Sequence, residues 1–135
     1  MDKSEIVRLL VDLLQDKADF ALLFGSYAKE NNIVRDDSDI DCAAFFYPKF
    51  VTDYSYLEIA EEFQLVYGRK LDLICLNTAD IIISMQVVVT GEVLFASSNE
   101  QLNRYRAQIL SRYIDFKRSR KIIEENILVR PKNAV

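Results

Sequence analysis

Two short segments decide the fold and the chemistry of this chain: Leu22-Leu23-Phe24-Gly25-Ser26-Tyr27-Ala28-Lys29 and Asp37-Ser38-Asp39-Ile40-Asp41. In the first, an apolar run ends at a glycine and a serine, which predicts a buried strand that turns directly into a short helix. In the second, two aspartates flank an isoleucine at the start of another apolar run, which predicts a second strand. Both segments therefore place polar groups at the end of a strand.

The two aspartates of the second segment are predicted to bind metal. Asp39 and Asp41 are two positions apart, so in a strand their carboxylates share one face while Ile40 points into the core. Adjacent carboxylates repel each other unless a cation lies between them. Oxygen ligands suit Mg²⁺ or Mn²⁺, and two such ions about 4 Å apart can hold the attacking and the leaving oxygen of a displacement at phosphorus.

The strand-to-helix junction of the first segment is predicted to hold phosphate groups. Gly25 has no Cβ, so a triphosphate can approach the backbone closely there. The start of the following helix, expected over residues 26–31, offers unpaired N–H groups and a positive dipole end. The hydroxyl of Ser26 adds one more donor, although Ser26 is also a suitable helix cap.

A third carboxylate, Asp72, lies in the apolar run over residues 71–76. An acid within such a strand is costly unless it reaches solvent or a metal ion. We predict that Asp72 ligates a second metal ion and accepts the proton of an incoming hydroxyl. A solvated residue at the edge of the sheet is the alternative interpretation.

The composition restricts the remaining chemistry. The chain has 135 residues and no histidine, so no catalytic base or triad can use an imidazole. Cys42 and Cys75 lie in apolar runs without a CxxC pair, which predicts buried, unreactive thiols. Residues 1–102 carry 18 acidic and 8 basic side chains, whereas residues 103–135 carry 9 basic and 3 acidic ones. This balance argues against general nucleic-acid binding and allows the basic end to meet an acidic partner.

The pattern of apolar residues predicts one α/β (α+β) domain over residues 1–135, with a small mixed sheet, helices packed on it and a long C-terminal helix. No apolar run is long enough to span a membrane, and no signal peptide is visible, which favours the cytoplasm. Strands are expected over 19–24, 40–46, 71–76 and 92–96, and helices from Ser4, over 54–66, from a cap at Thr78 to 89, and from 98 or 99 to about 128, with a loose tail from Pro131.

Gly25-Ser26, twelve intervening residues and Asp39-Ile40-Asp41 resemble the signature of the nucleotidyltransferase superfamily whose fold is that of DNA polymerase β. The neighbouring residues resemble its small stand-alone branch, although Glu30 replaces a common glycine and the spacer is slightly long. The C-terminal third is similar to the antitoxins of type VII toxin–antitoxin pairs. That similarity is carried by Val93-Leu94-Phe95 after Gly91 and by Tyr105, Tyr113, Asp115 and Arg118.

The resemblance implies AMP transfer from ATP to a tyrosine of a cognate HEPN ribonuclease toxin. It implies that Gly25 and Ser26 bind the nucleotide, and that Asp39, Asp41 and Asp72 are the catalytic metal ligands. Two alternatives stay open. The chain could neutralise a toxin by binding alone, through the apolar segment 81–89 and the basic C-terminal helix, or it could modify a small hydroxylated molecule such as an aminoglycoside.

Overall fold

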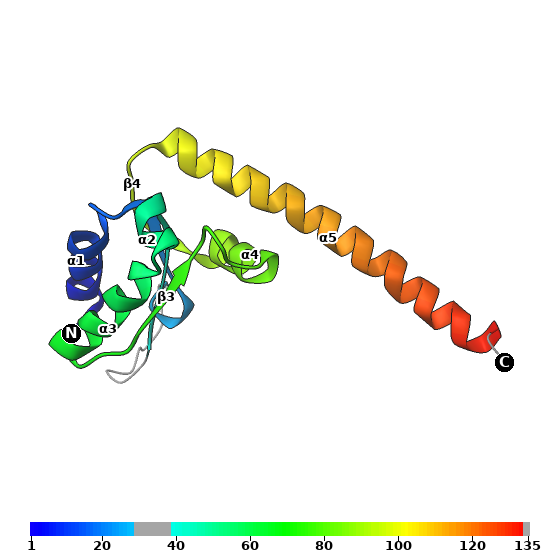
Figure 1. Ribbon diagram of the computed structural model, residues 1–135, viewed down its shortest axis with the longest axis horizontal. Helices are drawn as coiled ribbons and strands as arrows, with labels where there is room; N and C mark the ends of the chain where they lie inside the picture. Colours follow the sequence, from blue (N-terminus) through cyan, green and yellow to red (C-terminus); the bar gives the residue numbers. More distant parts are fainter. Residues whose placement is uncertain (29–38, 134–135) are drawn as a thin grey trace.

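The computed structural model describes residues 1–28 and 39–133, except for the side chains of Ser26, Ala28 and residues 128–133. The expected α/β architecture is confirmed (Figure 1). The elements are α1 (Lys3–Leu14), β1 (Ala18–Phe24), the 3₁₀ helix η1 (Gly25–Ala28), β2 (Ile40–Phe46), α2 (Pro48–Thr52), α3 (Ser55–Tyr67), β3 (Leu71–Cys75), α4 (Ile81–Thr90), β4 (Glu92–Ala96) and α5 (Asn99–Asn133).

The four strands form one mixed sheet in the order β3-β2-β1-β4. β1 pairs antiparallel with β2 and with β4, whereas β2 and β3 run parallel. The parallel pair is possible because α2 and α3 carry the chain back between them. The C-terminal end of β1 and the N-terminal ends of β2 and β3 therefore lie side by side, at one end of the strands.

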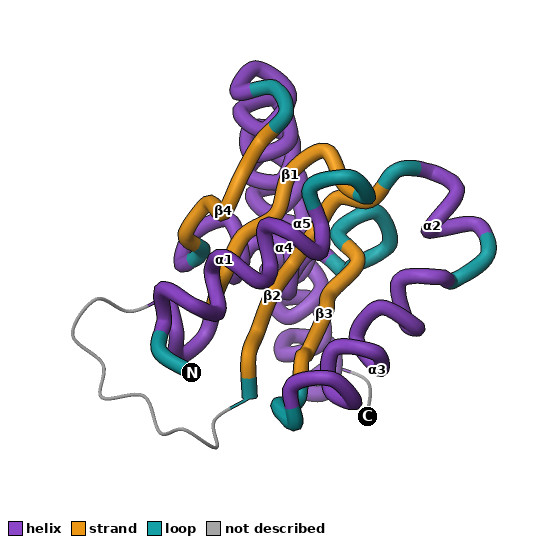
Figure 2. The backbone as a smooth tube through the Cα atoms, turned by 90° about the vertical axis from the view of Figure 1, so that its left-hand side faces the viewer, coloured by secondary structure: helices purple, strands orange, loops and turns teal. Residues whose placement is uncertain are grey.

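Helices cover both faces of the sheet, and Figure 2 shows α1 on the near side with α4 and α5 behind. Alternating strand residues divide the buried side chains into two clusters, because successive side chains point to opposite faces. We call the cluster under α1 and α3 the front core; it contains Ile6, Leu10, Leu14, Ala18, Ala21, Leu23, Tyr27, Ile40, Cys42, Ala44, Phe46, Ile59, Phe63, Leu71 and Cys75. The cluster under α4 and α5 is the rear core; it contains Phe20, Leu22, Phe24, Ala43, Leu76, Val87, Leu102, Tyr105 and Ile109.

The long helix α5 is anchored only by its first half. The ring of Tyr105 lies 5.2 Å from that of Phe20 and 5.7 Å from that of Phe45, so an aromatic cluster fixes α5 on the sheet. The remainder projects away from the body (Figure 1). The expected end near residue 128 is wrong, because α5 continues to Asn133.

Three local expectations need correction. The carboxylate of Asp2, not Ser4, caps α1 by accepting from the N–H of Glu5 at 2.9 Å. Asp80, not Thr78, caps α4. An anionic cap also interacts favourably with the helix dipole, which a hydroxyl does not. Helix α2 was not expected after β2; Pro48 both ends the strand and starts this helix, because its fixed φ suits the first helical position.

Both cysteines are free and buried, as predicted. Burial raises the pKa of the Cys42 thiol to about 12, so it stays protonated and unreactive at neutral pH. Within the described residues, no helix combines the length and apolar character that crossing a membrane requires.

Candidate active site

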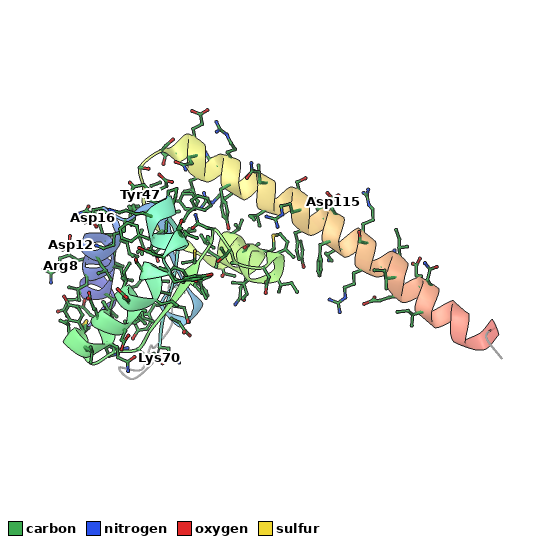
Figure 3. All side chains as sticks on the ribbon, viewed as in Figure 1. Arg8, Asp12, Asp16, Tyr47, Lys70 and Asp115 are labelled. Atoms are coloured by element: carbon green, nitrogen blue, oxygen red, sulfur yellow. The ribbon has the colours of Figure 1, made fainter. Side chains whose placement is uncertain are left out.

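The carboxylate of Asp41 lies at the start of β2, on the rear face of the sheet. Its neighbours Ile40 and Cys42 are buried in the front core, and Ala43 is buried in the rear core, so the strand alternation places Asp41 on the rear side. Asp39 precedes the strand, and its half-exposed carboxylate lies 3.7 Å from the ammonium group of Lys70. Figure 3 shows Lys70 at the edge of the body where β3 begins.

The parallel pairing of β2 and β3 brings Asp72 beside Asp41. The two residues are register partners, so they lie one strand spacing apart, about 5 Å. Leu71 belongs to the front core and Ile74 packs against the rear core, which places Asp72 on the same face as Asp41. Asp72 is exposed, and it lies on the edge strand of the sheet.

The surroundings of Asp41 disfavour its charged form. Burial raises the pKa of Asp41 above its ordinary value, and repulsion from Asp72 and Asp39, with a hydrogen bond to Asp72, raises it further. Lys70 opposes this effect in part. A cation placed among the three side chains would relieve the repulsion, and their oxygen atoms are the donors that Mg²⁺ or Mn²⁺ prefers.

The carboxylate oxygens are therefore suitable ligands for a divalent ion, but the three side chains do not surround a single position. In the part of the chain that the structure describes, no three acidic or thiol side chains gather closely enough to enclose an ion. Asp41 and Asp72 are together, while Asp39 faces Lys70. A metal ion held by all three would require Asp39 to exchange its partner.

Gly25 brings the predicted phosphate turn into contact with the carboxylates. It directly follows Phe24, the register partner of Asp41. Its φ of +69° is one that side chains disfavour, and a Cβ there would lie 2.2 Å from Oδ2 of Asp41. The turn that follows is a single 3₁₀ turn over Gly25–Ala28, and the rest of the expected helix and Glu30 lie outside the described residues, as does the side chain of Ser26.

Three residues near the site were not predicted from the sequence to belong to it: Tyr27, Arg69 and Lys70. Tyr27 is in the quoted motif but was not assigned a role. The guanidinium group of Arg69 donates a hydrogen bond to the hydroxyl of Tyr27 and lies 5.8 Å from its ring centroid. Arg69 and Lys70 are two adjacent cations directly before a strand that carries an aspartate, and this pattern could have drawn attention to them.

The segment that contains this turn and these carboxylates lies within a region that a known protein family matches. The family model described as polymerase beta, nucleotidyltransferase matches residues 8–100. The chain belongs to this family. No curated protein matches the chain.

Solved structures of toxin–antitoxin assemblies share the fold. One contains a tri-AMPylated Shewanella oneidensis HEPN toxin with its MNT antitoxin; it is 21% identical over 94% of this chain and 99% of that chain, with a TM-score of 0.73. A toxin–antitoxin structure with AMP-PNP is 22% identical over 95% and 99% of the two chains, with a TM-score of 0.71. A MntA complex with two aspartate-to-glutamate substitutions is 21% identical over 95% and 99%, with a TM-score of 0.69.

The close approach of Gly25 to Asp41 predicts the effect of one methyl group. Gly25→Ala should slow nucleotidyl transfer at least about tenfold, because the new Cβ displaces the Asp41 carboxylate. Gly68→Ala is a matched control, since Gly68 has a similar φ of +65° with no atom within 4 Å of its added Cβ. Both variants should lose about 1 kcal/mol of stability to backbone strain. Equal activities of the two variants, measured with their melting temperatures, would contradict the proposed contact.

Proposed function

We propose that this protein is a metal-dependent adenylyltransferase antitoxin, which transfers AMP from ATP to a tyrosine of a cognate HEPN ribonuclease toxin and so neutralises it. The observation that carries the proposal is the pair Asp41 and Asp72, adjacent in the sheet, with the carboxylate of Asp41 against the turn at Gly25. The related toxin–antitoxin structures, with an ATP analogue in one and an AMPylated toxin in another, support it.

Each residue has a defined task in this reaction. Gly25 and Ser26 receive the triphosphate, and Asp39 and Asp41 hold Mg²⁺ or Mn²⁺, which neutralises charge on the phosphate oxygens. Asp72 would ligate a second metal ion on the side of the acceptor tyrosine, and it takes the proton of the tyrosine hydroxyl. The tyrosine oxygen bonds to the α-phosphorus, the bond from that phosphorus to the bridging oxygen breaks, and pyrophosphate leaves with its electron pair.

We assign the contact with the toxin to the projecting half of α5. A groove of about 730 Å³ runs along it, between Ile82 of α4 and the side chains of Tyr113, Phe116, Lys117 and Lys121. Apolar side chains of α5 continue past the groove to Ile123, which is 57% exposed; we call Tyr113, Phe116 and Ile123 the apolar stripe of α5. An apolar stripe with basic side chains on both sides suits an acidic helical surface of the toxin. The excess of basic residues over 103–135 would attract the same acidic surface.

This contact predicts a separation of two activities. Ile123→Asp should weaken toxin binding at least about tenfold, because burying one isoleucine contributes about 1.5–3 kcal/mol. It should leave ATP affinity unchanged, since this half of α5 projects away from the sheet (Figure 1). Leu65→Asp on α3, at an even more exposed apolar position, is the control. Calorimetric titration of each variant with toxin and with ATP makes the test, and a Leu65→Asp defect as large as that of Ile123→Asp would contradict the assignment.

Two alternatives predict different products. A non-catalytic antitoxin would bind the toxin tightly without modifying it, as the exposed stripe of α5 would permit. A small-molecule transferase would label an aminoglycoside-type alcohol instead. Incubation of the protein with labelled ATP, Mg²⁺ and either toxin or aminoglycoside separates the three: we expect label on the toxin alone. We further propose that residues 1–135 act as one domain in the cytoplasm, with no membrane or direct nucleic-acid contact.

A further inference from the structure

Two consecutive residues before β3 contact both halves of the candidate site. Arg69 donates a hydrogen bond to the hydroxyl of Tyr27, which lies 42 positions earlier within the turn Gly25–Ala28. The carbonyl oxygen of Lys70 accepts from the N–H of Ile40 at 3.0 Å, next to Asp39 and Asp41. The segment 69–70 therefore joins the phosphate turn to the carboxylate strand across the sheet.

The contact between Arg69 and Tyr27 is well placed to fix the turn. Tyr27 is only 3% exposed, and its ring belongs to the front core. The guanidinium group lies 5.8 Å from the ring centroid and donates to the hydroxyl, while the ring is packed in the front core, so the tyrosine side chain is held on both sides. A single 3₁₀ turn has few and poorly aligned hydrogen bonds of its own, so its position depends on such contacts.

We propose that Arg69 is a positioning residue for the nucleotide: through Tyr27 it fixes the turn at Gly25 relative to Asp41 and Asp72. The inference rests on the proposed function, because it assigns this turn to the triphosphate of ATP. Asp72 lies three residues after Arg69, in β3, which begins two residues after Arg69. Arg69 thus links the phosphate turn to the segment that leads into the strand carrying Asp72, and loss of this link should weaken the binding of the triphosphate to the turn.

The first test separates nucleotide binding from the chemical step. Arg69→Met keeps the length of the side chain and removes the guanidinium group. We expect the Kd for ATP in Mg²⁺, without toxin, and the KM for ATP to rise about tenfold, with kcat at saturating ATP nearly unchanged. Arg69→Lys should recover part of the affinity, because an ammonium group can also donate to Tyr27. Arg8→Met, on the outer side of α1 (Figure 3), is the control.

The second test asks whether Arg69 acts through Tyr27. Tyr27→Phe removes the hydroxyl and keeps the buried ring, and we expect it to raise the Kd for ATP in the same direction. The double variant Tyr27→Phe with Arg69→Met should lose less ATP affinity than the sum of the two single losses, because both changes break the same hydrogen bond. Additive losses, or an unchanged Kd in Arg69→Met, would overturn the inference, as would a lower Tm and kcat with KM unchanged.

A failure of the proposed function would look different. If the unaltered protein bound no ATP in Mg²⁺, the assignment of the turn to a triphosphate would fail for every variant alike. The coupling between Tyr27 and Arg69 would still be measured by the melting temperatures of the two single variants and the double variant. Melting temperatures that add independently would overturn the contact itself, whatever the ligand.

Discussion

Replacing both Asp39 and Asp41 by asparagine is expected to abolish transfer of AMP while the fold stays intact. Asparagine keeps the shape of each side chain but is a poor ligand for Mg²⁺, so the charge of the reacting phosphates is no longer neutralised. A loss of about 4 kcal/mol of transition-state stabilisation corresponds to about a thousandfold slower reaction. Single-turnover rates with saturating ATP and toxin measure the effect, with the exposed Asp12→Asn on α1 as the control.

The pH dependence of stability provides an independent check on the same residues. Because the folded protein raises the pKa of Asp41, folding disfavours its charged form. The protein therefore loses stability as the pH rises from the ordinary carboxyl value of 3.8 through the raised value, and the penalty persists above it. Asp41→Asn removes this penalty, so the variant should melt no lower than the unaltered protein at pH 7 without metal. A clearly lower melting temperature, or unchanged transfer in the double variant, would contradict the account.

Asp72→Asn is expected to have the second largest effect, and on a different step. Asp72 lies beside Asp41 but on the edge strand, exposed to an incoming acceptor. Triphosphate binding should stay nearly intact, because Gly25, Ser26, Asp39 and Asp41 carry that task. The transfer rate should fall at least about tenfold, as for a lost general base.

Separate measurements of ATP affinity and transfer rate decide the role of Asp72. Asp12→Asn again controls for a change of net charge. An unchanged transfer rate would make Asp72 a solvated edge residue and leave a site of two aspartates. A collapse of ATP affinity would instead place it among the ligands of the triphosphate's metal ion.

The sequence predicted the elements better than their ends. Apolar runs of five to seven residues between polar breaks located the four strands of the sheet. Helix α3 ends at Tyr67, one residue beyond the expected range, and Gly68 caps it, because glycine readily adopts a left-handed cap. The caps Asp2 and Asp80 were missed since a nearby serine or threonine fits the same pattern. Helix α2 has only five residues and no buried side chain, so it leaves no apolar period to detect.

The candidate site was predictable in its residues but not in its contacts. The spacing of Asp39 and Asp41 indicated a shared face, yet the register that sets Asp72 beside Asp41 depends on how the strands pair. The approach of Gly25 to Asp41 depends on the pairing of β1 with β2. Contacts between residues so distant along the chain leave no local pattern, and the same holds for Arg69 and Tyr27.

The position of the transferred phosphorus tests the central claim most directly. The protein, its cognate toxin and Mg²⁺ are incubated with ATP labelled at the α-phosphate or, in parallel, at the γ-phosphate, and released pyrophosphate is measured. Nucleotidyl transfer predicts α-label on the toxin, no γ-label, and one pyrophosphate for each AMP attached, all absent in the Asp39→Asn and Asp41→Asn double variant. Label from the γ-phosphate on the toxin, or an unlabelled toxin that is nonetheless bound and silenced, would contradict it.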